Sequence, residues 1–252
     1  MSGHSKWATT KHRKAAVDAK RSALFSKLTR VITVAARSGG DPNPENNATL
    51  AAAIAKAKSY SLPKDKIETA INKAFGAGAD AAAFEEIVYE GYGPAGVALY
   101  VEALTDNRNR TAADVRAAFT KAGGNLGATG SVAFQFERKG EIVIERAGGP
   151  DEDELMLIVA DAGGEDMEVG DENYVVYTAS AEVMSVKSAL EQAGVPVKGA
   201  ELVMEPVNPT VVTLEEARKV LRLVDRLEES DDVQTVYHTM ELTDEIAAAL
   251  DE

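Results

Sequence analysis

The side chains best suited to chemistry are gathered in the first twenty-one residues, and the chemistry they suit is contact with a polyanion. This segment, MSGHSKWATTKHRKAAVDAKR, holds six Lys and Arg residues against a single acidic residue, Asp18. Lysine and arginine neutralise phosphate groups, whereas tryptophan and histidine rings offer flat faces on which a nucleobase stacks. The candidate nucleic-acid-binding residues here are His4, Lys6, Trp7, Lys11, His12, Arg13, Lys14, Lys20 and Arg21.

The charge of the N-terminal third opposes that of the rest of the chain. The 252 residues contain 27 Lys and Arg and 41 Asp and Glu, which gives a net charge of −14. Residues 1–80 hold 14 basic and 6 acidic side chains, a net of +8, so residues 81–252 carry the remaining −22. Because an acidic body repels polyanions, it would leave the basic segment to select the binding site. A solvated basic face without a partner is the alternative.

A second candidate for anion binding is the segment TDNRNRT, residues 105–111, which joins a predicted strand to a predicted helix. Thr111 with Asp114 three residues later fits the N-cap of that helix. Arg108 and Arg110 then stand beside the positive end of the helix dipole, and this combination suits an anion. A polar turn with exposed arginines explains the same residues equally well.

Catalysis and metal binding find little support in the sequence. The chain has no cysteine and three histidines, of which His238 stands alone in a predicted strand and is best explained as structural. No HExxH, GxSxG or paired metal-ligand spacing occurs. The Gly-rich residues 123–131 follow a helix and lack the Gly-Lys-Ser/Thr ending of a phosphate loop, so a helix end with a tight turn is the better interpretation. We expect no catalytic residues, no metal and no cofactor.

The compartment follows from what the chain lacks. No apolar run reaches the length of a membrane span, and the N-terminus has no apolar stretch of the signal-peptide type. We therefore expect a cytoplasmic protein with no membrane partner. The sequence is silent on oligomeric state, and a monomer is the default expectation.

The basic segment must be positioned by a small helical domain. Apolar residues recur at helical spacing from Val17 to Ala35, from about Glu45 to Tyr60 and from Pro63 to Phe75. Gly39-Gly40 ends the first of these helices. Extending that helix backward would place Arg13 in its apolar arc, so we predict that the basic segment is an arm continuing past the packed helices. The predicted domain covers residues 1–80.

Beyond residue 84 the apolar pattern changes to alternating strands and helices. The order strand, helix, strand, strand, helix, strand over residues 139–207 matches a ferredoxin-like unit. Residues 84–137 lack a second helix and a closing strand, which residues 210–252 would supply. The sequence thus predicts an α+β protein in which a three-helix domain precedes two ferredoxin-like α/β domains, the 139–207 domain being inserted into the one formed by 84–137 and 210–252. Strands are expected near 87–89, 97–104, 132–136, 141–145, 166–169, 174–178, 201–205 and 233–242, and helices near 111–122, 151–162, 181–193 and 214–229.

Six segments that span nearly the whole chain carry a family resemblance. They are GHSKWATTKHRKAAVDAKR (3–21), LPKDKIETAI (62–71), YEGYGP (89–94), TDNRNRTAADVR (105–116), GGNLGATGSVAFQFERKG (123–140) and DDVQTVYH (231–238). Together they resemble the YebC/PmpR family, which includes the mitochondrial translational activator of cytochrome oxidase subunit I. Thr9-Thr10 stands where the family usually has Asn-Ile. The resemblance implies three domains and no enzyme activity.

The resemblance does not decide whether the target is DNA or RNA. Family members are commonly described as DNA-binding transcriptional regulators, whereas others resemble translation factors that act on ribosomes, including ribosomes stalled on proline-rich sequences. The predicted third helix has a packed apolar face and few base-reading side chains, which weakens specific DNA readout. A basic aromatic arm with Gly-rich loops suits folded RNA.

The sequence therefore predicts a non-enzymatic nucleic-acid-binding regulator of gene expression, in family terms a DNA-binding transcriptional regulator. The first alternative is a ribosome-associated translation factor that contacts ribosomal or transfer RNA. The second is an acidic protein-interaction scaffold with an incidental basic arm.

Overall fold

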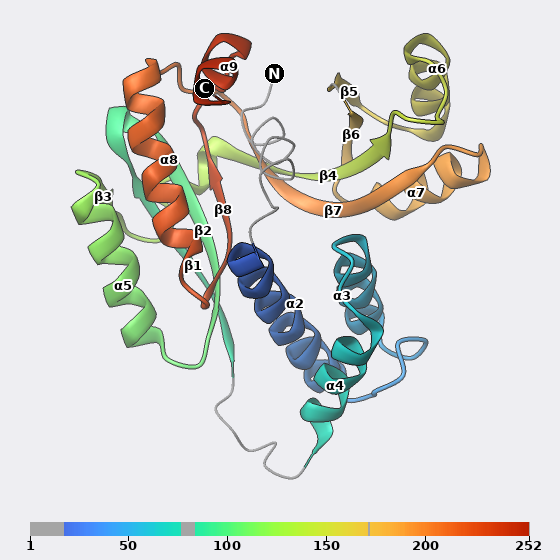
Figure 1. Cartoon of the computed structure of the whole chain (residues 1–252), viewed down its shortest axis with the longest axis horizontal. Coiled ribbons are helices and arrows are strands. Elements are labelled where there is room, and N and C mark those ends of the chain that lie inside the picture. Colours follow the sequence, from blue (N-terminus) through green and yellow to red (C-terminus); the bar gives the residue numbers. More distant parts are fainter. Residues whose placement is uncertain (1–17, 77–83, 171, 252) are drawn as a thin grey trace.

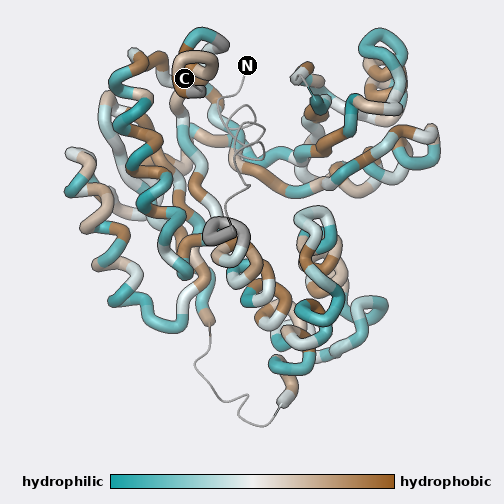
Figure 2. Tube along the Cα trace, in the orientation of Figure 1, coloured by the Kyte–Doolittle hydropathy of each residue, from teal (hydrophilic) through white to brown (hydrophobic). Residues whose placement is uncertain are grey.

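A computed structural model describes residues 18–76, 84–170 and 172–251 of the chain (Figure 1). Three helices are followed by two four-stranded antiparallel sheets, each with helices packed on one face. This arrangement confirms the predicted α+β class. We call residues 18–76 the helical unit and the remaining described residues the two-sheet body. Figure 2 shows apolar and polar stretches alternating along the helices, as expected for helices packed on one side.

The helical unit contains α2 (Asp18–Gly39), α3 (Ala48–Ser59) and α4 (Lys64–Phe75). Asn47 fixes the angle between the first two of these helices. Its Oδ1 accepts a hydrogen bond from the Leu50 amide at 3.0 Å and so caps α3, while its Nδ2 donates to the Ala35 carbonyl of α2 at 3.0 Å. The buried apolar cluster and the residues packed against it all come from positions 24–74, so the unit has a core of its own.

The first sheet has the strand order β3-β1-β2-β8. Two long helices, α5 and α8, pack on one face around Phe119 and Leu223, and the short C-terminal helix α9 packs on α8. The elements are β1 (Glu85–Tyr92), β2 (Ala98–Thr105), α5 (Arg108–Lys121), β3 (Asn125–Leu126), α8 (Leu214–Glu228), β8 (Val233–His238) and α9 (Asp244–Asp251), with a 3-10 turn over Pro94–Gly96.

The second sheet has the strand order β5-β6-β4-β7, and its two helices pack on one face around Leu155 and Leu190. Its chain order, strand, helix, strand, strand, helix, strand, is the predicted ferredoxin-like order. The elements are β4 (Phe136–Glu145), α6 (Glu152–Ala162), β5 (Asp166–Val169), β6 (Asn173–Ala179), α7 (Val183–Gln192) and β7 (Val197–Pro206).

The strands differ from the prediction in three places, the first being that β8 ends at His238 rather than at residue 242. The prediction of a strand over residues 132–136 is wrong, since Ala133–Gln135 forms a 3-10 turn and β4 starts at Phe136. The first sheet is completed by β3, inside the Gly-rich segment, which pairs with β1 at Gly91 and Tyr92. Helix α9 was not predicted, although Thr243 caps it through a hydrogen bond from the Ile246 amide at 3.3 Å.

The two sheets meet through apolar side chains. Phe136 of β4 lies 5.9 Å, between ring centroids, from Tyr100 of β2, which in turn lies 6.4 Å from Tyr237 of β8. Figure 1 shows β4 and β7 running from this junction out to α6 and α7. The buried residues of the junction are Ala98, Val132, Phe136, Val203 and Tyr237.

Candidate nucleic-acid interface

Most of the predicted nucleic-acid-binding residues precede the part of the chain that the structure describes. His4, Lys6, Trp7, Lys11, His12, Arg13 and Lys14 lie outside the described residues, so their role stays a prediction. Lys20 and Arg21 lie in the first turn of α2. The structure therefore describes the helix to which the basic segment is attached and the surface against which that helix packs.

The second predicted site lies at the start of α5, where the cap differs from the prediction. The helix starts at Arg108 rather than Thr111, and Asn107 is the N-cap, with its Oδ1 accepting from the Arg110 amide at 3.1 Å. Asparagine is as strong an N-cap as serine and stronger than threonine, so the helix begins at the earlier position. Thr111 is instead fully buried.

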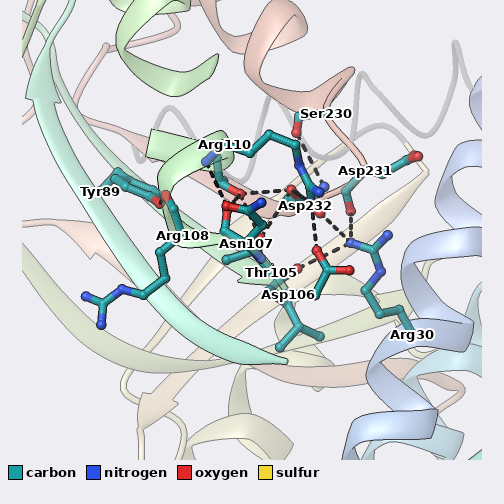
Figure 3. A network of polar contacts seen from close by, with 12 residues as sticks. Arg30, Tyr89, Thr105, Asp106, Asn107, Arg108, Arg110, Ser230, Asp231 and Asp232 are labelled. Atoms are coloured by element: carbon teal, nitrogen blue, oxygen red, sulfur yellow. Dashed lines mark hydrogen bonds and ion pairs between the residues drawn. The ribbon is translucent and has the colours of Figure 1, made fainter. Parts of the chain in front are cut away.

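The two arginines of this segment have different surroundings. The Arg108 side chain is 69% exposed and its guanidinium lies 3.5 Å from the carboxylate of Glu85. Arg110 donates hydrogen bonds to Asp106 at 2.8 Å and to Asp232 at 2.7 Å. In Figure 3 Arg108 points away from the network that Arg110 joins. The structure therefore does not bring the two guanidinium groups together, and Arg110 is engaged with the protein's own carboxylates.

Asp232, in the turn between α8 and β8, is the centre of this network (Figure 3). It is 6% exposed, and its Oδ2 accepts hydrogen bonds from Arg110 and from the Thr111 hydroxyl at 2.8 Å. Its Oδ1 accepts from Arg30 of α2 at 2.8 Å. Burial alone would raise the pKa of Asp232, but the hydrogen bonds from Arg110, Thr111 and Arg30 outweigh it and hold the pKa below its ordinary value. Asp232 is thus a buried anion shared by the helical unit and the first sheet.

Two cations of α2 face the body at this point. Arg30 also donates to the main-chain carbonyls of Asp231 at 2.9 Å and Leu104 at 3.3 Å, and its guanidinium lies 5.2 Å from the centre of the Phe84 ring. Lys27, three residues earlier on the same helix face, donates to the carbonyl of Glu228 at 2.6 Å. Glu228 is the last residue of α8, so this carbonyl belongs to the negative end of the helix dipole.

A second contact joins the helical unit to the second sheet. Lys56 of α3 forms an ion pair with Glu201 of β7, and Glu201 lies directly opposite Glu141 in the β4–β7 ladder. Burial would lower the pKa of Lys56, but the carboxylates of Glu201, Glu102 and Glu141 outweigh it and raise the pKa above its ordinary value. Burial, followed by repulsion from Glu201 and other carboxylates, raises the pKa of Glu141 to about 8. Lys56 thus faces three carboxylates, those of Glu201, Glu102 and Glu141.

The Gly-rich segment, residues 123–131, is held in place by a carboxylate of β1. The buried carboxylate of Glu90 accepts hydrogen bonds from the amides of Gly130 at 2.7 Å and of Val132 and Ala133 at 2.8 Å each. These bonds outweigh the effect of burial and lower the pKa of Glu90. After α5, the Gly123 and Gly124 amides donate back to Thr120 and Phe119, as in a Schellman cap. The segment therefore consists of a helix end, the short strand β3 and a turn, and amides that could hold a phosphate hold Glu90 instead.

Other functional classes find no support in the described ranges. Among residues 18–76, 84–170 and 172–251, no group of three or more His, Asp or Glu side chains is arranged to hold a metal ion. His238 is fully buried in β8, in keeping with the structural role expected for it. No helix within the same ranges is both long enough and apolar enough to cross a membrane.

Sequence reasoning did not identify Asp232, Arg30 or Lys56 as linking residues. Nothing in DDVQTVYH indicates that the carboxylate of Asp232 is buried. One signal was available: the segments 105–116 and 231–238 both carry the family resemblance, and they meet at Asp232. Residues 89–94 and 123–140 likewise meet at Glu90.

Comparison with known proteins covers nearly the whole chain. Residues 5–77 match a family model described as the TACO1/YebC protein N-terminal domain, and residues 84–240 match one described as the TACO1/YebC second and third domain. A protein of Rubrobacter xylanophilus is 51% identical over 98% of both chains, and one of Bifidobacterium animalis subsp. lactis is 51% identical over the full length of both. Each of these relatives is named a probable transcriptional regulatory protein. The crystal structure of a conserved hypothetical protein from Aquifex aeolicus has a TM-score of 0.82 and 45% identity, covering 91% of this chain and 94% of that one.

Proposed function

The chain belongs to the TACO1/YebC family, and on that premise we propose that it is a non-enzymatic cytoplasmic regulator of gene expression that binds nucleic acid through its basic N-terminal segment. The observation that carries the proposal is the division of charge, +8 over residues 1–80 against −22 over residues 81–252. A phosphate backbone attracts the first region and repels the second, which orients the protein on its target. The names of the relatives support a regulatory role.

The names of the relatives also favour DNA as the target and transcription as the level of control. An RNA target at the level of translation is the second candidate, and the surface of α4 favours it. Ile67, Ala70 and Ala74 of α4 are buried, while Asp65 and Glu68 are exposed between its lysines. A recognition helix in a major groove needs cations and base-reading side chains on its outward face. Since α4 places Asp65 and Glu68 among Lys64, Lys66 and Lys73 on that face, a DNA backbone would meet repulsion as well as attraction there, and shape-based contact with RNA through the arm fits this unit better.

The arm is tested by replacing Lys11, Arg13 and Lys14 with alanine. We expect weaker binding to a fluorescein-labelled RNA hairpin or DNA duplex, and a plot of log K against log salt whose slope falls by about 3, near 0.9 for each phosphate that is no longer neutralised. Fluorescence anisotropy measures both quantities. The matched control replaces Lys64, Lys66 and Lys73 of α4, which removes the same charge from the same basic region, residues 1–80. If the two triple variants weaken binding equally, the arm contributes only through its net charge. If the arm variant binds with unchanged affinity, the arm is not the binding site.

The level of control is tested by in-cell crosslinking of the tagged protein, followed by sequencing of all recovered DNA and RNA. Enrichment of discrete promoter DNA makes the protein a transcriptional regulator. Enrichment of ribosomal or transfer RNA, absent for the arm variant, makes it a translation factor. Recovery of neither above background contradicts the proposal and supports a protein-interaction scaffold.

A further inference from the structure

We propose that the helical unit has a second phosphate-binding face, formed by Lys27, Arg30 and Lys56, which the acidic body covers in this structure and which nucleic acid uncovers by competing for the same cations. The inference rests on the proposed function, because it concerns the same ligand. It adds a binding site outside the basic arm and gives the acidic body a role, which is to cover that site.

The three cations meet the kind of atoms that a nucleic acid would offer. Arg30 contacts a carboxylate oxygen of Asp232 and two main-chain carbonyls, Lys56 contacts a carboxylate oxygen of Glu201, and Lys27 contacts the last carbonyl of α8. Each of these is a negatively polarised oxygen, as are the non-bridging oxygens of a phosphate. In Figure 3 Arg30 reaches from α2 across to Asp231 and Asp232. The body therefore supplies the contacts that a phosphate backbone would supply.

These contacts occupy the charged groups of the cations while the helical unit is docked. The Arg30 side chain is 24% exposed, and its Nη1 already contacts Asp232 and the carbonyls of Leu104 and Asp231. Lys56 is 40% exposed and its ammonium faces Glu201. Because residues 81–252 carry a net charge of −22, they also repel a phosphate that approaches this interface.

The interface is built so that it can open. The apolar cluster of the helical unit is drawn from residues 24–74 and stays within that unit when it moves. Asp232 keeps its hydrogen bonds from Arg110 and Thr111 after Arg30 has left, so the Asp232 carboxylate still has partners. The Lys56–Glu201 ion pair is partly exposed, so salt weakens it and a dense polyanion competes for its lysine. Opening therefore exchanges one set of negatively polarised oxygen atoms for another.

The chain offers a site at which the interface can be locked. A Cβ atom built on Gly199 of β7 would lie 3.5 Å from the Cβ of Ser59, the last residue of α3. This distance falls within the range of disulfide-bonded cysteines. The natural chain has no cysteine, so a Ser59→Cys, Gly199→Cys variant can form only this one intramolecular disulfide. Oxidation closes the interface and a reductant releases it in the same protein.

The experiment is an anisotropy titration of the full-length double-cysteine variant, oxidised and reduced, over a range of salt concentrations. The probes are a labelled RNA hairpin and a DNA duplex of equal length, which separate the two sources of the phosphate backbone. We expect the oxidised form to bind about tenfold more weakly than the reduced form, with a salt slope smaller by about 3, because three cations are withheld from the phosphates. Each single-cysteine variant should behave alike with and without reductant.

A second variant tests the same claim in the opposite direction. Glu201→Gln removes the carboxylate that holds Lys56, so we expect tighter binding and a steeper salt dependence. Glu152→Gln on α6 is the matched control, since it makes the same charge change on an exposed helix away from the interface. Equal binding by the oxidised and reduced forms, or equal effects of Glu201→Gln and Glu152→Gln, would overturn the hidden face while the arm still binds. Absence of binding by every form, including the natural protein, would instead overturn the proposed function.

Discussion

The two junctions of this molecule are built from different chemistry. The two sheets meet through Phe136, Val203 and Tyr237, which are all buried. The helical unit meets the body through Lys27, Arg30 and Lys56, which face carboxylates and main-chain carbonyls. The first junction depends on excluding water from apolar surface, whereas the second depends on charge attraction that salt screens.

The difference separates a permanent contact from a conditional one. Apolar burial is stabilising at any ionic strength, so the two sheets should behave as one body. The ionic junction gains little where its charges stay partly in water, and other anions compete for it. We infer that the molecule keeps its acidic body fixed and lets the basic helical unit respond to its surroundings.

The largest expected effect comes from breaking the apolar junction. Phe136→Ala removes a buried ring that packs on Tyr100, and we expect a loss of about 3 kcal/mol in the free energy of unfolding. The loss should be the same at low and high salt. Urea denaturation followed by circular dichroism measures it. Phe134→Ala is the control, because Phe134 is 73% exposed and its removal should change stability by less than about 0.5 kcal/mol. A loss that shrinks markedly in high salt would contradict the apolar account of this junction.

A smaller effect is expected from the centre of the ionic junction. Asp232→Asn removes the charge shared by Arg30 and Arg110, and we expect a loss of about 2 kcal/mol at neutral pH. Because the pKa of Asp232 is lowered in the folded state, its contribution is present above its ordinary pKa and is lost as the pH falls through the folded value. The variant and the natural protein should therefore converge in stability in strong acid.

Asp231→Asn is the matched control for this prediction. It makes the same charge change one residue away, but Arg30 contacts only the main-chain carbonyl of Asp231, which the variant keeps. Urea denaturation of both variants across the acid range gives the comparison. If Asp231→Asn costs as much as Asp232→Asn, the shared carboxylate is not what holds the junction.

The smallest effect concerns the excess of carboxylates facing Lys56. Burial raises the folded pKa of Glu141 to about 8, above an ordinary value of 4.5. Protonated Glu141 therefore contributes stability that is fully present below pH 4.5 and is lost as the pH rises through 8. Between pH 7 and pH 8 the natural protein should lose about 1 kcal/mol that Glu141→Gln retains. Thermal unfolding of both proteins at pH 7 and at pH 8 measures this loss. If both proteins lose the same stability between the two pH values, Glu141 is already ionised at pH 7.

The sequence predicted the elements better than it predicted their contacts. Amphipathic spacing located the three helices of the helical unit, and the strand–helix order of residues 139–207 indicated the second sheet, because both signals are local. The junctions could not be predicted in this way. Asp232, Arg30 and Arg110 lie far apart in the chain, and only the folded structure brings them together. The sequence predicts the helix end and the turn of the Gly-rich segment but not the strand β3 between them, and the carboxylate of Glu90 that holds the turn gives no local signal.

The most direct test of the difference between the junctions is a pair of distances measured by pulsed electron paramagnetic resonance. Spin labels at Lys73→Cys on α4 and Asp161→Cys on α6 span the ionic junction, and labels at Ala113→Cys on α5 and Asp161→Cys span the apolar one. We predict that added nucleic acid, or salt raised to about 1 M, broadens and shifts the first distance distribution and leaves the second unchanged. A first distribution that stays as narrow as the second under both conditions would contradict the account.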